Sequence, residues 1–242
     1  MKHKITFRKI IACATAVALV SSIIPDTGLH IENIKIHAAS QVVGELSYEV
    51  ESSSGVKVVG LSDASATTDL VIPANVIIDE KEYSVVSIGE RAFYGNTTLA
   101  SITIPASVKE IKKEAFANCS GLTEVSYPEG NNVEKLGVAA FAGCQELTGI
   151  EIGKNLTEVE EKESWESDVF EGCSKLGEVI LEEGMEKIPA YLFQSCSGIK
   201  TIEIPSSVKE IGKEAFANCS GLTEPPSSSS NSTPRNSSFS FP

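Results

Sequence analysis

The sequence has no histidine after residue 37, and it has few basic residues. Its three histidines are His3, His30 and His37, and 20 Lys and Arg residues stand against 33 Asp and Glu residues, a formal net charge of −13. Nucleic-acid binding needs a surface rich in Lys and Arg that displaces counterions from the phosphates. The charge balance therefore excludes nucleic acid as a partner.

Long hydrophobic runs are also absent, apart from one near the start. Ile10–Ile24 follows a basic start and precedes a polar stretch that ends in HAAS, which is the order typical of a secretory signal peptide. The run is shorter than the roughly 20 residues of a membrane-spanning helix, although a retained anchor remains the alternative. We expect removal of residues 1–39, a secreted or cell-surface protein, and no membrane segment after cleavage.

Removal of this segment takes every histidine with it. It also removes five basic and two acidic residues, which leaves 15 basic against 31 acidic residues and a net charge of −16. Catalysis that depends on histidine, and metal sites built on imidazole, are then excluded. We expect a protein that is not an enzyme and that has no catalytic residue, metal site or cofactor.

Aromatic residues make up only 6% of the sequence, yet one Phe recurs at nearly regular spacing. Spacings of 23, 25, 29, 23 and 23 residues separate Phe93, Phe116, Phe141, Phe170, Phe193 and Phe216. The stretch KEAFANCSGLTE also occurs twice, starting at Lys113 and Lys213, because it is one element of this period repeated four turns later. A regular period of this length predicts a stack of structural repeats.

Each period contains a short strand pattern. The segments LASITIP, LTEVSYP, LTGIEIG, LGEVILE and IKTIEIP start at Leu99, Leu122, Leu147, Leu176 and Ile199. Alternation of apolar and polar residues predicts strands with one buried face, and the Pro that often follows ends the strand. A second apolar pair, such as Val108 with Ile111, leads into a short turn or helix that carries the Ala-Phe pair. Stacked copies would share one core.

The pattern L-x-x-I-x-I-P followed by I-x-x-x-A-F-x-x-C resembles the BspA-like leucine-rich repeat family of bacterial secreted and surface proteins. The resemblance covers about Leu70–Glu224. It implies a leucine-rich repeat solenoid with a parallel β-sheet on the concave side and short strands, turns or short helices on the other. It also implies adhesion or recognition of extracellular partners.

The regions beside the repeats have other patterns. Residues 40–66 contain two predicted strands, Glu45–Val50 and Val56–Val59, around the turn-forming Ser-Ser-Ser-Gly, and we expect an N-terminal β-hairpin cap. The solenoid then covers residues 67–224 in about six repeats. Residues 225–242 begin with two prolines and are rich in Ser, so we expect a disordered tail.

Cysteine is scarce after residue 39, and each one lies three residues after a repeat Phe. The five are Cys119, Cys144, Cys173, Cys196 and Cys219. An odd number at one repeated position, without CxxC spacing, predicts small buried core residues rather than zinc ligands. Disulfides between neighbouring turns remain the alternative, although parallel side chains fit the disulfide torsion poorly. The six repeat Phe residues are also expected in the core.

The candidates for binding are acidic residues and the single tryptophan. Outward strand positions include Glu124, Glu151, Glu178 and Glu203, which form either a solvated face or a site for a cation or basic partner. Trp165 lies in the segment Glu158–Asp168 inside the longest period, and such insertions often form loops on the binding side. Trp165 either anchors a partner or folds back onto the stack.

The leading functional hypothesis is a secreted, non-catalytic recognition or adhesion module. It would bind an extracellular protein or glycan through the solenoid surface, and we expect a monomer. The alternative is a structural spacer or an accessory domain of a larger surface protein or extracellular hydrolase.

Overall fold

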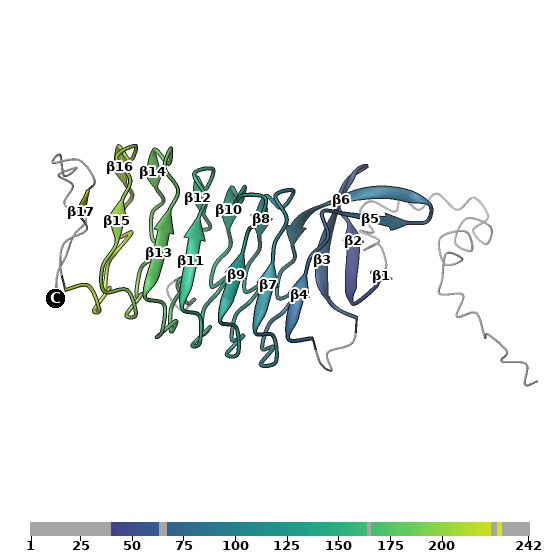
Figure 1. The fold of residues 1–242 in the computed structure, drawn as a ribbon, viewed down its shortest axis with the longest axis horizontal. Coiled ribbons are helices and arrows are strands. Elements are labelled where there is room, and N and C mark those ends of the chain that lie inside the picture. Colours follow the sequence, from purple (N-terminus) through teal and green to yellow (C-terminus); the bar gives the residue numbers. More distant parts are fainter. Residues whose placement is uncertain (1–39, 63–66, 164–165, 224–226, 229–242) are drawn as a thin grey trace, which may run out of the picture. The chain divides into compact units, whose positions relative to one another are not determined.

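The computed structural model describes residues 40–62, 67–163, 166–223 and 227–228. The expected signal segment, and all but two residues of the expected tail, lie outside the described residues. The described part of the chain consists of short strands joined by turns and forms a parallel β-solenoid (Figure 1). Within this part there is no helix of the length and hydrophobicity that a membrane span requires.

The first strands of successive turns lie along one side of the solenoid in a row that we call the first ladder, and they pair in parallel within three separate groups. Its inward residues pair with one another from turn to turn, as Leu70 with Ile102 and Ile102 with Val125. This register keeps the apolar side of every strand on the core, because a slip of one residue would turn it toward solvent. The strands are β4 (Asp69–Val71), β7 (Ser101–Thr103), β9 (Glu124–Ser126), β11 (Gly149–Ile152), β13 (Glu178–Leu181), β15 (Glu203–Ile204) and β17 (Ser227–Ser228).

The second apolar pair of each turn contributes a short strand to another parallel row, which we call the second ladder. These are the short strands that the family resemblance implied for the other side of the solenoid, although the repeat pattern by itself indicated only a turn or helix after this pair. The two-residue strands pair in register in two separate groups, as Ile111 with Leu136 and Ile188 with Ile211. The strands are β8 (Glu110–Ile111), β10 (Lys135–Leu136), β12 (Glu158–Val159), β14 (Lys187–Ile188) and β16 (Glu210–Ile211).

The N-terminal strands extend the second ladder. Strands β1 (Gln41–Val43), β2 (Leu46–Val50) and β3 (Gly55–Leu61) pair antiparallel in sequence order. Strand β3 then pairs parallel with β6 (Lys81–Ile88), which also forms an antiparallel hairpin with β5 (Asn75–Ile78) and pairs parallel with β8. The hairpin expected around Ser-Ser-Ser-Gly is therefore β2–β3, and it lies beside the first solenoid turn.

The third side of each turn carries the repeat Phe and is built from turns, not from the short helices that the pattern also allowed. The residue two positions before the Phe has a positive φ in five turns, and the residue two positions after it does so in all six. A helix cannot contain left-handed residues at this spacing. Gly or Asn fills most of the later positions, because both tolerate this conformation: Gly95, Asn118, Gly143, Gly172 and Asn218.

A column of phenylalanine rings runs through the core. The six repeat Phe residues are at most 5% exposed, and rings of neighbouring turns stack with centroids 5.1 to 5.9 Å apart and planes within 17° of parallel. This separation lies in the range of offset stacking, which adds about 0.5–1.5 kcal/mol per pair beyond burial. Each turn is therefore held mainly by its two neighbours.

Truncation of one ring in the middle of the column should destabilise the whole solenoid. We expect Phe141→Ala to lower the free energy of unfolding by about 3–5 kcal/mol, because it leaves a cavity where a fully buried ring stacked on both sides. Urea denaturation followed by circular dichroism measures this. The matched control is Ile180→Ala at a half-exposed outward position, with an expected loss below about 1 kcal/mol. Equal losses in the two variants would contradict the stacked core.

Candidate functional site

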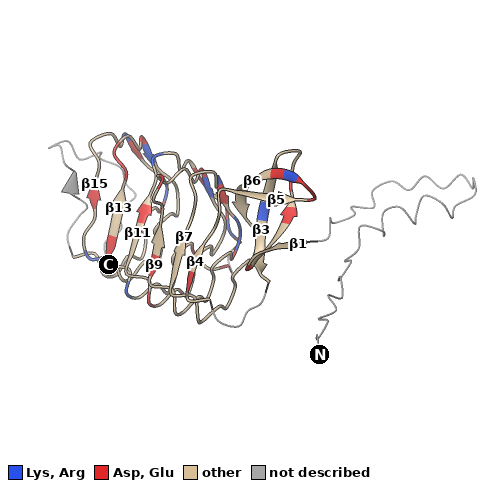
Figure 2. Cartoon of the chain, turned by 45° about the vertical axis from the view of Figure 1, so that its right-hand side comes forward, with Lys and Arg blue, Asp and Glu red and all other residues tan. Residues whose placement is uncertain are grey.

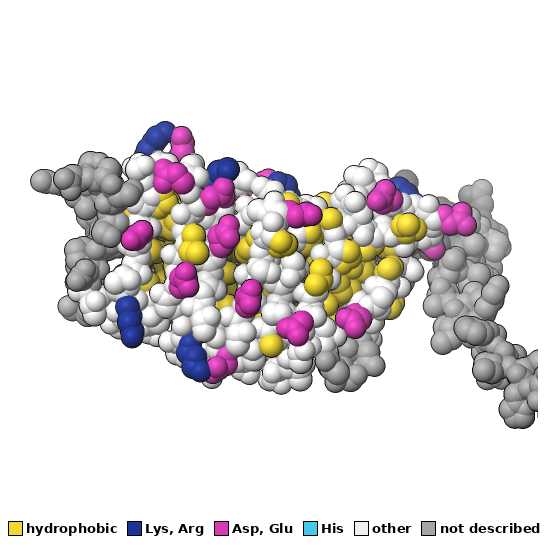
Figure 3. Space-filling view, viewed as in Figure 1, with side chains coloured by type: hydrophobic (Ala, Val, Ile, Leu, Met, Phe, Trp, Pro, Cys, Tyr) yellow, Lys and Arg dark blue, Asp and Glu magenta, His cyan; other side chains and the backbone are white. Residues whose placement is uncertain are grey.

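The outward side of the first ladder presents two columns of side chains. The pairings place Asp69, Ser101 and Glu124 in one column and Val71, Thr103 and Ser126 in the other. Further along, Gly149 pairs with Glu178, and Glu151 pairs with Ile180. The predicted outward orientation of Glu124, Glu178 and Glu203 agrees with their exposure, and Glu151 is half-buried. Figure 3 shows acidic side chains scattered over this face, with hydrophobic side chains between them.

A hollow of about 500 Å³ lies on this face and brings three of the four predicted glutamates together. Glu124, Glu151 and Glu178 line it, with Gly149 between them in the sheet and Ile180 at its side. Glu203 does not line it. Gly149 places no side chain in this hollow, whereas its ladder partner Glu178 carries one. Gly149 and Ile180 were not among the predicted binding residues, although both stand at outward positions of LTGIEI and EVIL.

The two ladders differ in how their charges are neutralised. On the second ladder, Lys and Glu of neighbouring turns form ion pairs: Lys109–Glu134 at 3.1 Å, Lys135–Glu158 at 2.8 Å, Lys187–Glu210 at 2.8 Å and Lys209–Glu186 at 2.6 Å. None of the ion pairs formed by the described residues includes Glu124, Glu151, Glu178 or Glu203. Figure 2 shows the acidic residues of the first ladder as red segments on β9, β11, β13 and β15.

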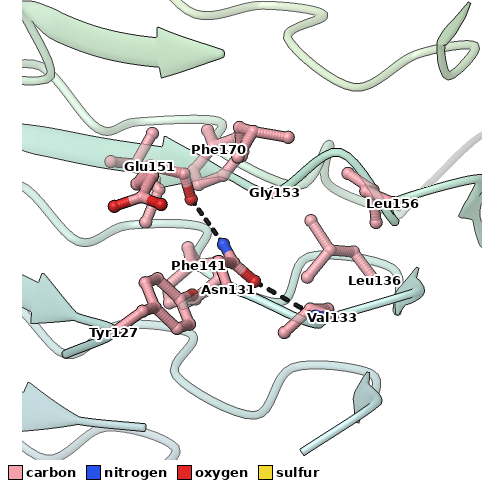
Figure 4. A pocket seen from close by; sticks show the side chains of 11 residues that line it. Tyr127, Asn131, Val133, Leu136, Phe141, Glu151, Gly153, Leu156 and Phe170 are labelled. Carbon is pink, nitrogen blue, oxygen red and sulfur yellow. Dashed lines mark hydrogen bonds between the residues drawn. The ribbon is translucent and has the colours of Figure 1, made fainter. Parts of the chain in front are cut away.

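The backbone of β11 is held from beneath by a buried amide. Asn131 is 5% exposed; its Nδ2 donates to the carbonyl oxygen of Glu151 at 2.8 Å, and its Oδ1 accepts from the amide of Val133 at 3.1 Å (Figure 4). Asn131 follows Gly130 in the 25-residue period between Phe116 and Phe141, which is two residues longer than the usual 23. The longer turn thus brings an inward amide that fixes the strand carrying Glu151.

Tyr127 lies between the interior and the hollow, and it lines both the hollow and a small cavity beside Asn131. That cavity measures about 10 Å³, about the size that holds one water. Burial and the nearby Glu151 carboxylate raise the pKa of Tyr127 above its usual value. Its hydroxyl therefore stays neutral at physiological pH and adds no charge beneath the glutamates.

The insertion that carries Trp165 lies on another side of the solenoid. Trp165 itself is outside the described residues. Its neighbour Glu166 forms an ion pair with Lys113, and Glu160 accepts a hydrogen bond from the amide of Val138 at 3.3 Å. Lys113 and Glu166 line a separate hollow of about 460 Å³ on the turn side. The described residues of the insertion therefore do not line the hollow over Gly149.

The first two residues of the predicted insertion segment Glu158–Asp168 belong to the repeat. Glu158 and Val159 form β12 of the second ladder, where they pair with Lys135 and Leu136. The extra residues of the longest period thus come after β12. Among them, Asp168 is 4% exposed and pairs with Lys162 at 2.5 Å.

The five cysteines form a column of buried free thiols. Each Sγ donates to the carbonyl oxygen of the repeat Phe one turn earlier, as Cys119 to Phe93 at 3.0 Å, Cys144 to Phe116 at 3.2 Å and Cys219 to Phe193 at 2.9 Å. Cys173 does the same at 3.1 Å, and Cys196 at a longer 4.0 Å. The thiols thus act as weak donors that satisfy carbonyl groups inside the stack.

The clustering of carboxylates on the first ladder stops short of a metal centre. Within the described ranges, no three His, Cys, Asp or Glu side chains lie where they could share one metal ion. The described part of the face presents a row of carboxylates and hydroxyl groups with two exposed apolar side chains, Val71 and Ile180.

Comparisons with known proteins point to one kind of repeat. A family model described as the BspA type leucine rich repeat region matches in six copies over residues 74–164 and 160–241. A search of curated proteins gave no match.

Three solved structures share the fold. A leucine rich cell surface protein from Faecalibacterium prausnitzii A2-165 is 26% identical with a TM-score of 0.55, and the match covers 82% of this chain and 57% of that one. A leucine-rich repeat protein from Bacteroides ovatus ATCC 8483 is 28% identical with a TM-score of 0.51, covering 77% and 53%. The pneumococcal vaccine antigen PcpA is 21% identical with a TM-score of 0.61, and the match covers 77% of this chain and 49% of that one. At this identity the likeness shows a shared fold and nothing more. This chain spans about half the length of these proteins.

The thiol column should make the fold sensitive to alkaline pH. Burial raises the pKa of Cys119 to about 12 and that of Cys219 to about 11. An unfolded thiol has a pKa of about 8.5, so above that pH the unfolded chain loses protons that the folded chain keeps. The free energy of unfolding should therefore hold below about pH 8 and fall by about 1 kcal/mol per thiol by about pH 9.5.

Urea denaturation under reducing conditions across this pH range measures the effect. The double variant Cys119→Ala and Cys219→Ala should show a shallower decline, and an equal slope would contradict the thiol explanation. In a parallel titration with a thiol reagent, the five cysteines of the described chain should react after unfolding and be protected before it. Three or fewer reactive thiols in the unfolded chain would indicate disulfides instead.

Proposed function

Because this chain belongs to the BspA-type leucine-rich repeat family, we propose that it is a non-catalytic recognition module. It works outside the cell or at its surface and binds an extracellular protein or glycan through the outward face of the first ladder. The observation that carries the proposal is that the described carboxylates of this face, Glu124, Glu151, Glu178 and Glu203, form no ion pair, whereas those of the second ladder pair with lysines. The structurally similar Faecalibacterium protein is described as a cell surface protein.

The dimensions of the face suit a protein-sized partner. Six described strands, β4 to β15, about 4.8 Å apart span roughly 25–30 Å, which is comparable to the width of a standard protein interface. The strands are fixed by ladder hydrogen bonds, so the outward side chains are presented on a rigid frame and little ordering is needed on binding.

A second candidate role is a structural spacer or an accessory domain of a larger surface protein or hydrolase. It is favoured by the coverage of the solved relatives, of whose length this chain spans about half. A spacer does not require that the first ladder bind anything, and this separates the two proposals experimentally.

Blocking the face should weaken recognition without unfolding the protein. We expect the purified protein to bind at least one member of an array of extracellular matrix proteins and glycans. Ser126→Tyr places a large side chain at an outward position of β9, and we expect it to weaken that binding by about tenfold or more, because the partner must then move away from the sheet. Biolayer interferometry measures the affinity.

The matched control is Thr157→Tyr, which adds the same ring at an exposed position just before β12 of the second ladder. It should leave the affinity unchanged within about twofold, and both variants should melt at the temperature of the parent protein. An array without any binding, or equal weakening by both variants, would favour the spacer role.

A further inference from the structure

The hollow over Gly149 is bordered by acidic side chains of three turns of the first ladder. Glu124, Glu151 and Glu178 come from three successive strands, of which β11 and β13 pair in parallel and so lie about 4.8 Å apart. A Cβ built on Gly149 would lie 3.9 Å from Oε2 of Glu178, so this carboxylate reaches over the glycine. Three carboxylates thus border a space that no side chain of the sheet fills.

This charge is available to a partner. Like charges this close repel one another in water by about 1 kcal/mol or less per pair, and none of the described ion pairs relieves the repulsion here. The described outward positions of strands β4 to β15 carry no Lys or Arg. A cation from a partner would meet three carboxylates without first displacing a lysine of this chain.

The side of the hollow is apolar. Ile180 is 52% exposed, pairs with Glu151 in the ladder and lines the same space. Lys and Arg side chains bury their aliphatic stems on apolar surface while the charged head reaches polar groups. A side chain entering over Gly149 could lay its stem against Ile180 and place its head among the carboxylates.

The face also lacks what a sugar would use. Its described outward strand positions carry no aromatic residue, and the tyrosine that lines the hollow, Tyr127, is an inward-facing residue packed against the core. A sugar ring would therefore find no exposed aromatic ring to stack on. Net charge favours the same kind of partner, because a chain of −13 attracts basic surfaces over a distance of about one Debye length.

We propose that the hollow over Gly149 receives a Lys or Arg side chain of a polypeptide partner, held by Glu124, Glu151 and Glu178 and packed against Ile180. This inference rests on the proposed function and names the partner class of the same face. The second ladder, whose glutamates are already paired with lysines, does not compete for this side chain.

A side chain added at Gly149 provides a test that leaves the charge unchanged. In Gly149→Val the added Cβ meets its nearest neighbours at 3.5 Å, an ordinary contact, and Val is favoured in strands. The variant should fold with equal or greater thermal stability. It should weaken binding of a fluorescent peptide of alternating Arg and Ser by about tenfold, as measured by anisotropy in about 50 mM salt with a chelator present.

Removal of the carboxylates provides the second arm. The triple variant Glu124→Gln, Glu151→Gln and Glu178→Gln should weaken peptide binding by about tenfold or more. The matched control changes the net charge equally on the second ladder, by Glu134→Gln, Glu158→Gln and Glu210→Gln, and should lose less than about threefold. A peptide with citrulline in place of Arg should not bind.

Several outcomes would overturn the inference. Equal losses of peptide affinity in the two triple variants would show that the peptide responds to the net charge of the protein and not to these three glutamates. Full peptide affinity in Gly149→Val would show that the peptide does not use the hollow. A cationic chitosan oligosaccharide that binds more tightly than the peptide, and is lost in Gly149→Val, would assign the site to glycans. Suppose that an array partner binds Gly149→Val as tightly as the parent protein and binds Ser126→Tyr more weakly. That result would keep the recognition function and reject this inference. An array without any binding would reject the recognition function itself.

Discussion

Contact between successive turns is the interaction on which the rest of the structure depends. A single turn has only two- to four-residue strands in most places, too short to be stable alone. The ladders, the ring column and the thiol-to-carbonyl bonds all join one turn to the next. The outward faces are therefore held rigid by backbone pairing and by buried side chains. These contacts do not depend on the outward side chains.

The period of the Phe residues was sufficient to predict the repeat architecture. It works because a residue that recurs once in every turn lies on the same side of each turn, even where extra residues lengthen the period, as the stack from Phe93 to Phe216 shows. Other features were beyond the pattern. The second ladder has strands of two residues, such as Glu110–Ile111, too short for alternation to be recognised. The turns around each Phe contain residues in the left-handed conformation, such as Glu114 and Asn118. Because Glu rarely adopts this conformation, its presence in the sequence does not predict such a turn.

The candidate site was predictable in part for the same reason. Alternation within a strand shows that Glu124 and Glu178 face outward, but it does not show which side chains of different strands adjoin. That depends on register, and in β11 the register places Gly149 beside Glu178 and Glu151 beside Ile180. The contribution of Asn131 depends on a turn with two extra residues, whose path no repeat pattern describes. The role of Trp165 stays a prediction, since it lies outside the described residues.

The separation of inward and outward positions has an evolutionary consequence. Substitution at Gly149, Ile180 or Ser126 alters what the face presents, while the inward residues Ile150 and Val179 next to them keep the stack intact. A repeat array built in this way can acquire a new binding specificity through a few point mutations and retain its fold throughout. Duplication of a turn would lengthen the face by one row, so that both the extent and the chemistry of the surface can vary by small genetic steps.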